Sequence, residues 1–286
     1  MPRLKQPTKI KQLKEIVGKP YFESQNVLLY KMDCLEFMKK IDRPIFDLTI
    51  TSPPYNIGKE YERKIEVKQY VDWSNMWTNK VYDITKKNGA FWLNLGYFSV
   101  PEKGIAVPIP YLIWNETKFY FLQEIIWYYE AGMSASKKFA PRNEKFLWYI
   151  KNPKKYVFNL NSVRDKNVKY PNQKKNGILK VNPNGKNPTD VWAIPKITSG
   201  NGRSSKERTS HPAQFPIKVI DRIVRACSKT NNFIFDPFVG SGTVAVSALQ
   251  NNRCVVGCDI KSKYLKIAIK RIEELKNNHK SPNTFN

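Results

Sequence analysis

Two short polar segments of the sequence carry residue types that can bind and activate a small ligand. The first runs Asp236-Pro237-Phe238-Val239-Gly240-Ser241-Gly242-Thr243, between an expected strand and an expected helix. Its two glycines remove side chains, so a ligand can approach the backbone amides, and the start of the helix adds a positive dipole end. Asp259 ends the next expected strand. A carboxylate there can accept hydrogen bonds from both hydroxyls of a ribose.

The residues that this first segment lacks restrict the classes of ligand that it could bind. It has no lysine at the place that binds phosphate in a P-loop, and it lacks the full glycine fingerprint of dinucleotide-binding proteins. Tight strand–helix turns also use glycine for purely structural reasons, so the two glycines alone have little weight. Together with Asp259 they favour a nucleoside-type ligand without a large phosphate cluster, a description that S-adenosylmethionine fits.

The second segment is Thr51-Ser52-Pro53-Pro54-Tyr55-Asn56, again at the carboxyl end of an expected strand, the edge at which doubly wound sheets bind ligands. The two prolines fix the backbone and leave carbonyls that intramolecular amides do not easily satisfy. These carbonyls and the Ser52 hydroxyl can accept hydrogen bonds from an amino group, and Tyr55 offers a flat face to an aromatic ring. The alternative is a polyproline-like surface turn with an incidental tyrosine.

The elements that must position both segments alternate along the chain. Apolar periodicity predicts strands at 26–30, 45–50, 90–95, 124–129, 146–150, 233–235 and 254–258. Helices are expected from Trp73 to a stop at Asn88-Gly89, after Pro216, at 243–249 and around 265–272. Strands that alternate with helices predict an α/β sheet covered by helices on both faces.

The net charge of +25 favours a polyanionic partner, most commonly nucleic acid. A lysine-rich composition without such a partner is the alternative. Residues 1–20 carry five lysines and few large apolar residues, which predicts a loosely held arm. Residues 151–187 are crowded with Lys, Asn and Pro, which predicts an inserted, mostly irregular region with a basic surface.

Composition also excludes several classes of protein. An apolar content of 41% argues against wholesale disorder. No apolar run is long enough to cross a bilayer, and the basic N-terminus lacks the apolar stretch of a signal peptide, so a cytoplasmic protein is expected. With two histidines and no metal-ligand spacing, no metal site is expected. The cysteines are predicted to be small core residues, namely Cys34, Cys227, Cys254 and Cys258.

Taken together, the two segments resemble the amino-methyltransferases of DNA, in which a DPPY or SPPY motif marks the catalytic site and a (D/F)xFxGxG-type motif the cofactor site. The resemblance extends from about Asn26 to Ile272, and the catalytic motif comes first, as in the β group. Three further segments match, at Arg142-Asn143-Glu144-Lys145, Asp190-Val191-Trp192 and His211–Pro216. The resemblance implies a Rossmann-like, doubly wound, mostly parallel sheet and methyl transfer from S-adenosylmethionine to a base of double-stranded DNA.

The same resemblance assigns roles to individual residues. The catalytic set is Ser52, Pro53, Pro54 and Tyr55, with Tyr55 stacking on a base swung out of the duplex. Asp33 matches the acidic position that meets the adenine of the cofactor, although Glu36 three residues later equally predicts a helix N-cap. The remaining cofactor-binding residues are Asp236, Phe238, Gly240, Ser241, Gly242, Thr243 and Asp259.

These assignments divide the chain into four parts. They are a basic N-terminal arm (1–25), a catalytic half (26–150), a target-recognition region (151–190) and a cofactor-binding half (191–286). His211 is expected to have a structural or cofactor-adjacent role. The polar segment around Tyr61 and Arg63 either closes over DNA or is a solvated loop.

The first letter of the catalytic motif predicts the target base. A serine there is typical of cytosine-N4 enzymes and an aspartate of adenine-N6 enzymes, so Ser52 favours cytosine. The pair Tyr55-Asn56 is also common after the aspartate form, so adenine stays open, as do an RNA substrate and a catalytically silent nucleic-acid-binding protein. Carbon-5 methylation needs a cysteine after a proline, which the chain lacks. The implied partner besides DNA is a cognate restriction endonuclease; the oligomeric state is not indicated.

Overall fold

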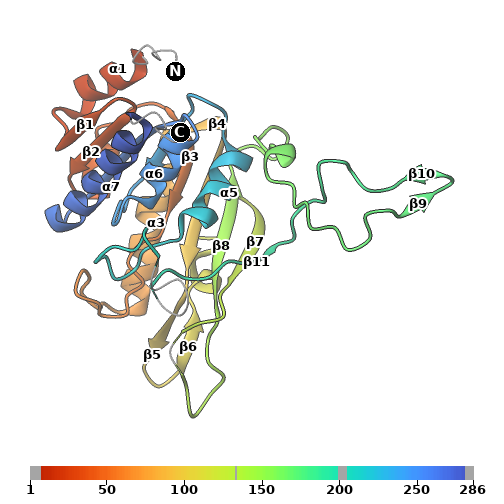
Figure 1. The fold of residues 1–286 in the computed structure, drawn as a ribbon. Helices are drawn as coiled ribbons and strands as arrows, with labels where there is room; N and C mark the ends of the chain where they lie inside the picture. The colour runs from red at the N-terminus through yellow and green to blue at the C-terminus, as the bar shows by residue number, and fades with distance from the viewer. Residues whose placement is uncertain (1–7, 133, 199–204, 281–286) are drawn as a thin grey trace.

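A nine-stranded mixed sheet forms the centre of the protein, whose computed structural model describes residues 8–132, 134–198 and 205–280 (Figure 1). The strands of this sheet are, in chain order, β1 (Phe22–Ser24), β2 (Val27–Lys31), β3 (Phe46–Thr51), β4 (Thr85–Leu95), β7 (Tyr120–Tyr128), β8 (Asn143–Ile150), β11 (Val191–Ala193), β12 (Phe233–Asp236) and β13 (Cys254–Asp259). Their spatial order is β1-β2-β13-β12-β3-β4-β8-β7-β11.

The five neighbouring strands β2, β13, β12, β3 and β4 run parallel. Strand β8 is antiparallel to both β4 and β7, while the edge strand β11 runs parallel to β7. The predicted mostly parallel α/β sheet is therefore confirmed. Strand β8 interrupts the parallel arrangement, because it runs antiparallel to both of its neighbours. Consequently the start of β8 lies at the same edge of the sheet as the carboxyl ends of the parallel strands.

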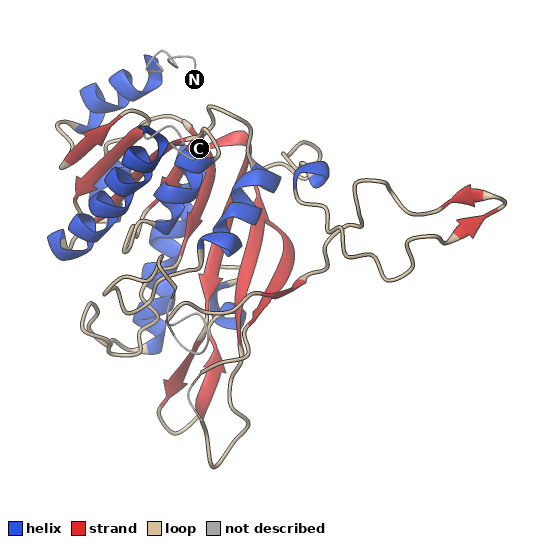
Figure 2. Ribbon diagram, viewed as in Figure 1, coloured by secondary structure: helices blue, strands red, loops and turns tan. Residues whose placement is uncertain are grey.

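Helices cover both faces of the sheet (Figure 2). One face carries α1 (Thr8–Val17), α2 (Cys34–Lys39), α3 (Val67–Ile84) and α4 (Pro110–Ile113), and the other carries α5 (Ile217–Cys227), α6 (Thr243–Gln250) and α7 (Ser262–Lys280). Each face has its own apolar core. Strand β4 shows the alternation, because Trp92 packs in one core while Phe91 and Leu93 pack in the other. All four cysteines are buried core residues, as predicted.

The N-terminal arm differs from the sequence-based expectation. Residues Thr8–Val17 form helix α1, and its side chains Ile10, Leu13 and Val17 are buried in the core beside α2. Each buried aliphatic side chain contributes about 1.5–3 kcal/mol, which is enough to hold a ten-residue helix in place. The prediction of a loosely held arm is wrong for these residues, because three apolar residues at helical spacing outweigh the surrounding lysines. Residues 1–7 lie outside the described part.

The predicted boundary between helix α3 and strand β4 also lies several residues too far along the chain. The helix starts at Val67 rather than Trp73 and ends at Ile84, and the strand begins at Thr85 rather than after Gly89. The register of β4 against β3 shifts between Phe46 and Leu48, which absorbs the extra residues.

Residues 151–190 form a largely irregular extension that projects far from the body of the molecule (Figure 1). Its outer part, residues 164–187, is called the projecting hairpin below. The tip pairs β9 (Lys174–Lys175) with β10 (Ile178–Leu179) across a turn at Asn176-Gly177, where both residues have positive φ. At its base a bridge joins Asp165 to Lys186. A second, smaller hairpin of β5 (Tyr97–Val100) and β6 (Gly104–Pro108) leaves the body in another direction.

Candidate active site

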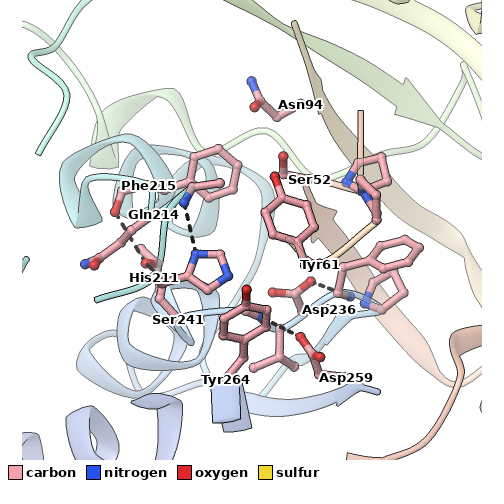
Figure 3. A pocket seen from close by; sticks show the side chains of 18 of the residues that line it. Ser52, Tyr61, Asn94, His211, Gln214, Phe215, Asp236, Ser241, Asp259 and Tyr264 are labelled. Atoms are coloured by element: carbon pink, nitrogen blue, oxygen red, sulfur yellow. Dashed lines mark hydrogen bonds between the residues drawn. The ribbon is translucent and has the colours of Figure 1, made fainter. Parts of the chain in front are cut away.

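One edge of the sheet gathers the polar residues that follow its strands. Asp236 ends β12, Asp259 ends β13, and Ser52 follows the last residue of β3. These three residues line one cavity of about 320 Å³, together with Asn94 near the end of β4 and Glu144 near the start of β8. Figure 3 shows Ser52, Asp236 and Asp259 around this common space. A volume of this size suits a drug-sized ligand.

The structure brings the two predicted sets of site residues together at this cavity. Of the twelve predicted residues, only Gly242 does not line it. The lining residues from those sets are Asp33, Ser52, Pro53, Pro54, Tyr55, Asp236, Phe238, Gly240, Ser241, Thr243 and Asp259. Gly242 has φ +74°, and a β-carbon there would lie 2.6 Å from the β-carbon of Ala268, so its role is close packing of the loop on α7.

Asp259 fastens the glycine loop to the end of β13. Its carboxylate accepts hydrogen bonds from the backbone N–H groups of Gly240 at 2.9 Å and Lys261 at 2.8 Å. Burial raises the pKa of Asp259 above its ordinary value. Gly240 has φ +49°, and a β-carbon there would lie 2.9 Å from Nε2 of His211. Only glycine therefore lets this loop approach His211 so closely.

Asp236 is buried beneath the same loop and stabilises it through hydrogen bonds. Its Oδ1 accepts hydrogen bonds from the Thr51 hydroxyl at 2.7 Å and from the Phe238 N–H at 3.1 Å. Burial raises the pKa of Asp236 to about 7. Through Thr51 this carboxylate ties the cofactor-type loop to the strand that carries the Ser52-Pro53-Pro54-Tyr55 motif.

Asp33 is an N-cap, as one of its two predicted roles requires, and it also lines the cavity, as the cofactor role requires. Its Oδ1 accepts hydrogen bonds from the N–H groups of Leu35 at 2.8 Å and Glu36 at 3.2 Å, so it is the N-cap of α2. The same residue lines the cavity. The two interpretations are compatible, because the cap uses one carboxylate oxygen.

Aromatic rings form two walls of the cavity. Phe238 packs against Trp73 and Trp77, at ring-centroid distances of 5.8 and 5.3 Å. On the other side His211 lies 4.4 Å from Tyr264, centroid to centroid, and Tyr61 stacks on His211 at 6.3 Å (Figure 3). Burial, with a smaller contribution from nearby Lys59, lowers the pKa of His211 to about 4, so its imidazole is neutral at pH 7.

The catalytic-type motif is part of a continuous chain of polar contacts. The Ser52 hydroxyl donates to the Tyr55 hydroxyl at 2.9 Å, and the Tyr55 hydroxyl donates to Asn94 Oδ1 and to Glu144 Oε2, the latter at 3.2 Å. Glu144 Oε1 in turn accepts from Lys196 Nζ at 2.6 Å. Three segments that are distant in the sequence therefore meet at Tyr55, and Lys196 joins them through Glu144.

One expectation for this motif needs correction. Both proline carbonyls were expected to be available to an amino group, but the Tyr70 hydroxyl of α3 donates to the Pro54 carbonyl at 2.8 Å. The helix that packs under the motif thus claims this acceptor. The loop that follows is held by Glu62, which accepts from the N–H groups of Asn56 at 2.7 Å and Ile57 at 2.9 Å. This places Tyr61 at the cavity rather than in a solvated loop.

Several residues that line the cavity are not among the site residues predicted from the sequence. They are Lys59, Trp73, Asn94, Trp127, Glu144, Lys196 and Tyr264. A signal existed for two of them. Asn94 interrupts an apolar strand, and Glu144 lies in the matched segment before β8. Lys196 lies in a region of scattered lysines, where nothing in the sequence distinguishes it.

The fold and the cavity define a class I methyltransferase. The cytosine-N4-specific PvuII DNA methyltransferase superposes with a TM-score of 0.68 at 19% identity, over 91% of this chain and 93% of that one. The M1.HpyAVI structure, solved as a complex with S-adenosylmethionine, superposes with a TM-score of 0.57 at 22% identity, over 86% and 98% of the two chains. At these identities the structures establish the fold.

The chain belongs to the N6/N4 family of DNA methylases, whose family model matches residues 46–270. The Type II methyltransferase M.ScaI of Streptomyces caespitosus is 56% identical over 266 residues, which cover 93% of this chain and 88% of that protein. The predicted family membership is therefore confirmed, and the protein is a DNA methyltransferase that uses S-adenosylmethionine as its methyl donor.

Two sequence-based expectations concern membrane spans and metal sites. In residues 8–132, 134–198 and 205–280, no helix is long and apolar enough to cross a membrane. The same residues contain no cluster of histidine, cysteine or acidic side chains that could hold a metal ion.

Proposed function

We propose that this protein methylates the exocyclic N4 of cytosine within a specific sequence of double-stranded DNA. The observation that carries this proposal is Ser52, the first residue of its catalytic motif, whose side chain lines the same cavity as the Asp236–Thr243 loop. A serine at this position is typical of cytosine-N4 enzymes. The PvuII enzyme, whose fold is the same, is named cytosine-N4-specific.

The residues of the cavity suit the cofactor. S-adenosylmethionine supplies an electrophilic methyl group on a sulfonium centre. Asp259, on a strand end beside a glycine loop, would take the two ribose hydroxyls, and the Gly240 loop that lines the same cavity would hold the methionine portion. Asp33 would meet the adenine amino group, and Phe238 offers an apolar face.

The reacting amino nitrogen needs acceptors, because its lone pair is delocalised into the base. The Ser52 hydroxyl and the Pro53 carbonyl would hold its hydrogens and expose the lone pair for direct transfer, without a covalent enzyme intermediate. Swinging the base out of the duplex costs roughly a few kcal/mol. Stacking on Tyr55 would offset part of this cost; Gly96 packs against the Tyr55 ring, where a β-carbon would lie 3.0 Å from Cε2.

We propose that the projecting hairpin contributes to target recognition. It contains six lysines and one arginine against one aspartate. All six lysines lie at exposed positions along it, at 166, 169, 174, 175, 180 and 186. Exposed apolar and aromatic side chains lie among them, with Tyr170 62% and Ile178 74% exposed. Lysines suit phosphate contacts, whereas aromatic and apolar side chains suit contacts in a groove.

The identity of the methylated nucleoside tests the proposed base. Oligonucleotides or plasmid DNA methylated by the purified protein would be digested to nucleosides and analysed by mass spectrometry. We expect N4-methylcytosine. Finding N6-methyladenine would overturn the cytosine assignment and favour the alternative that the family name and the Tyr55-Asn56 pair keep open.

A restriction–modification role follows from the same proposal. The relative M.ScaI is named a Type II methyltransferase, which supports a cognate restriction endonuclease as a biological partner. DNA methylated in vitro should resist one particular sequence-specific endonuclease.

A further inference from the structure

We infer that Lys196 and Glu144 are positioning residues that fix the direction of the hydrogen bonds through Tyr55, so that the Ser52 hydroxyl meets the target amino group only as an acceptor. The inference rests on the proposed function in one respect, namely that the substrate presents an amino group to Ser52. It concerns contacts that the catalytic motif by itself does not contain.

The chain of contacts begins at a partly buried ion pair. Lys196 Nζ lies 2.6 Å from Glu144 Oε1, and the two side chains are 22% and 15% exposed. The ammonium also lies 3.9 Å from the centroid of the Tyr129 ring, a favourable position for a cation. Burial lowers the pKa of Lys196, but the charges and hydrogen bonds of Glu144 and Tyr129 together outweigh this effect, so the net shift is upward and Lys196 stays charged. A carboxylate in such a pair has only acceptor sites to offer.

The next link is the Tyr55 hydroxyl, which has one proton and two acceptors facing it. One acceptor is Glu144 Oε2 at 3.2 Å, and the other is Asn94 Oδ1. The orientation of the Asn94 amide is fixed because its Nδ2 donates to the Lys145 carbonyl at 3.2 Å. Burial, followed by the charge of Glu144, raises the pKa of Tyr55 well above its ordinary value, so the hydroxyl keeps its proton. That proton must therefore point toward Asn94 or Glu144.

The direction of the last link follows from the previous one. With its proton engaged, the Tyr55 oxygen presents lone pairs to Ser52, and the Ser52 hydroxyl donates to it at 2.9 Å. A serine hydroxyl has one proton and two acceptor sites, so its remaining capacity is to accept. In the reversed arrangement the Ser52 proton would face the amino group and repel its hydrogens.

This polarity matters most as the methyl group is transferred. The amino nitrogen gains positive charge, its hydrogens become more acidic, and an acceptor beside them stabilises the transition state more than the ground state. Lys196 and Glu144 do not need to touch the base for this effect. They act through Tyr55, and so the inference predicts coupling between residues at opposite ends of the chain of contacts.

The test is a double-mutant cycle between Glu144→Gln and Ser52→Ala. Glutamine has nearly the same shape but can donate a hydrogen bond to Tyr55 and cannot pair with Lys196. We expect Glu144→Gln to lower the single-turnover rate about 10-fold or more, with S-adenosylmethionine and DNA affinities unchanged within about twofold. In the Ser52→Ala background the same substitution should have almost no effect, because the acceptor that it orients is gone.

Two further variants keep the result interpretable. Tyr55→Phe retains the stacking ring and removes one link, so it allows the same cycle if the Ser52→Ala enzyme is too slow to measure. Lys196→Met should resemble Glu144→Gln. Its matched control is Lys86→Met, which breaks the ion pair between Lys86 and Asp47, also 2.6 Å long, away from the cavity. The control should leave the rate unchanged.

Equal rate losses from Glu144→Gln in both backgrounds would overturn the inference and indicate a structural ion pair. So would an unchanged rate in the Glu144→Gln enzyme. Failure of the proposed function would be recognised by a different measurement, namely the identity of the methylated nucleoside that the unsubstituted enzyme produces. If the product is N6-methyladenine, the base assignment is wrong while the ratio of rates still decides the polarity of Ser52.

Discussion

The carboxyl edge of the sheet and the projecting hairpin differ in how their residues are held. At the sheet edge, side chains from β3, β4, β8, β12 and β13 converge on one cavity, and each is fixed by contacts from other strands. In the hairpin, the tip pairs only β9 with β10, and residues 171–180 are all exposed. Side chains at the sheet edge are therefore fixed by tertiary packing, whereas those of the hairpin form an open basic surface, which suits the proposed contact with DNA.

Removal of the hairpin gives the largest expected effect. Replacing residues 168–183 by a short Gly-Ser linker keeps the base, where Asp165 bridges Lys186. We expect the preference for the target sequence over other DNA to fall by about 10³-fold, near the low end of specificity ratios for DNA-binding proteins. Competition binding with target and non-target duplexes measures it. Retained preference in this variant would assign target recognition to another surface, and calorimetry should show unchanged cofactor affinity as the control.

Ser52→Ala tests the rigid region at its reactive point. It removes one acceptor and leaves both prolines and Tyr55 in place, so single-turnover methylation should fall about 10²–10³-fold, as for other transition-state hydrogen-bond partners. The melting temperature and S-adenosylmethionine affinity should change little. A normal rate would mean that the backbone carbonyl alone orients the amino group.

Asp259→Ala tests the cofactor side of the cavity. Loss of charge-assisted hydrogen bonds to the ribose should weaken S-adenosylmethionine binding by about 1.5–3 kcal/mol. Because Asp259 also accepts from Gly240 N–H, Asp259→Asn is the companion variant that retains an acceptor oxygen. The binding constants come from calorimetry without DNA. Unchanged affinity in both folded variants contradicts the assignment of the ribose site.

Charge removal within the hairpin should have a smaller effect than removal of the whole hairpin. Lys174→Gln, Lys175→Gln and Lys180→Gln together should reduce the slope of log affinity against log salt by about 0.9 for each lysine that contacts phosphate. Fluorescence anisotropy at several salt concentrations measures this slope. Three lysines on helix α7 provide the control, with Lys263→Gln, Lys266→Gln and Lys270→Gln combined; an equal reduction there would indicate general charge attraction.

A pH dependence of stability that comes from Asp236 is also expected. Its pKa rises from 3.8 in the unfolded chain to about 7 in the folded protein, because of burial. Between these values the folded state binds more protons, so this residue makes the free energy of unfolding decrease as pH rises from about 4 to 7. Asp236→Asn should remove that decrease while its side-chain oxygen still accepts from Thr51. Denaturant titrations of both proteins at several pH values isolate the difference.

The strand pattern of this fold was largely predictable because buried strands leave continuous apolar runs. The strands expected at 26–30, 45–50, 233–235 and 254–258 appear as β2, β3, β12 and β13 within a residue of those limits. Helix α1 is not predicted because its few apolar residues, of which Ile10, Leu13 and Val17 are buried, lie among lysines. The end of α3 was misplaced because Asn88-Gly89 reads as a helix stop, whereas the residues from Thr85 onward already pair with β3.

The candidate site divides in the same way. Local sequence patterns identify Ser52, Tyr55 and the glycine loop as site residues, since turns after strands need particular residues at fixed spacing. These patterns do not predict that Glu144 contacts Tyr55 or that Lys196 pairs with Glu144. The two residues lie 89 and 141 positions from Tyr55 along the chain (144 − 55 and 196 − 55). No local pattern encodes a contact over that separation.

The sequence by itself determined which strands end in polar residues, which glycines permit a close approach, and that the protein is strongly basic. These properties are local or additive, so spacing and composition reveal them. The tertiary structure alone decided that β8 runs antiparallel and brings Glu144 to the edge where the parallel strands end. It also decided that Tyr70 takes the Pro54 carbonyl and that Lys196 reaches Glu144. Strand order and direction set these contacts, because they place residues from distant parts of the chain within hydrogen-bonding distance.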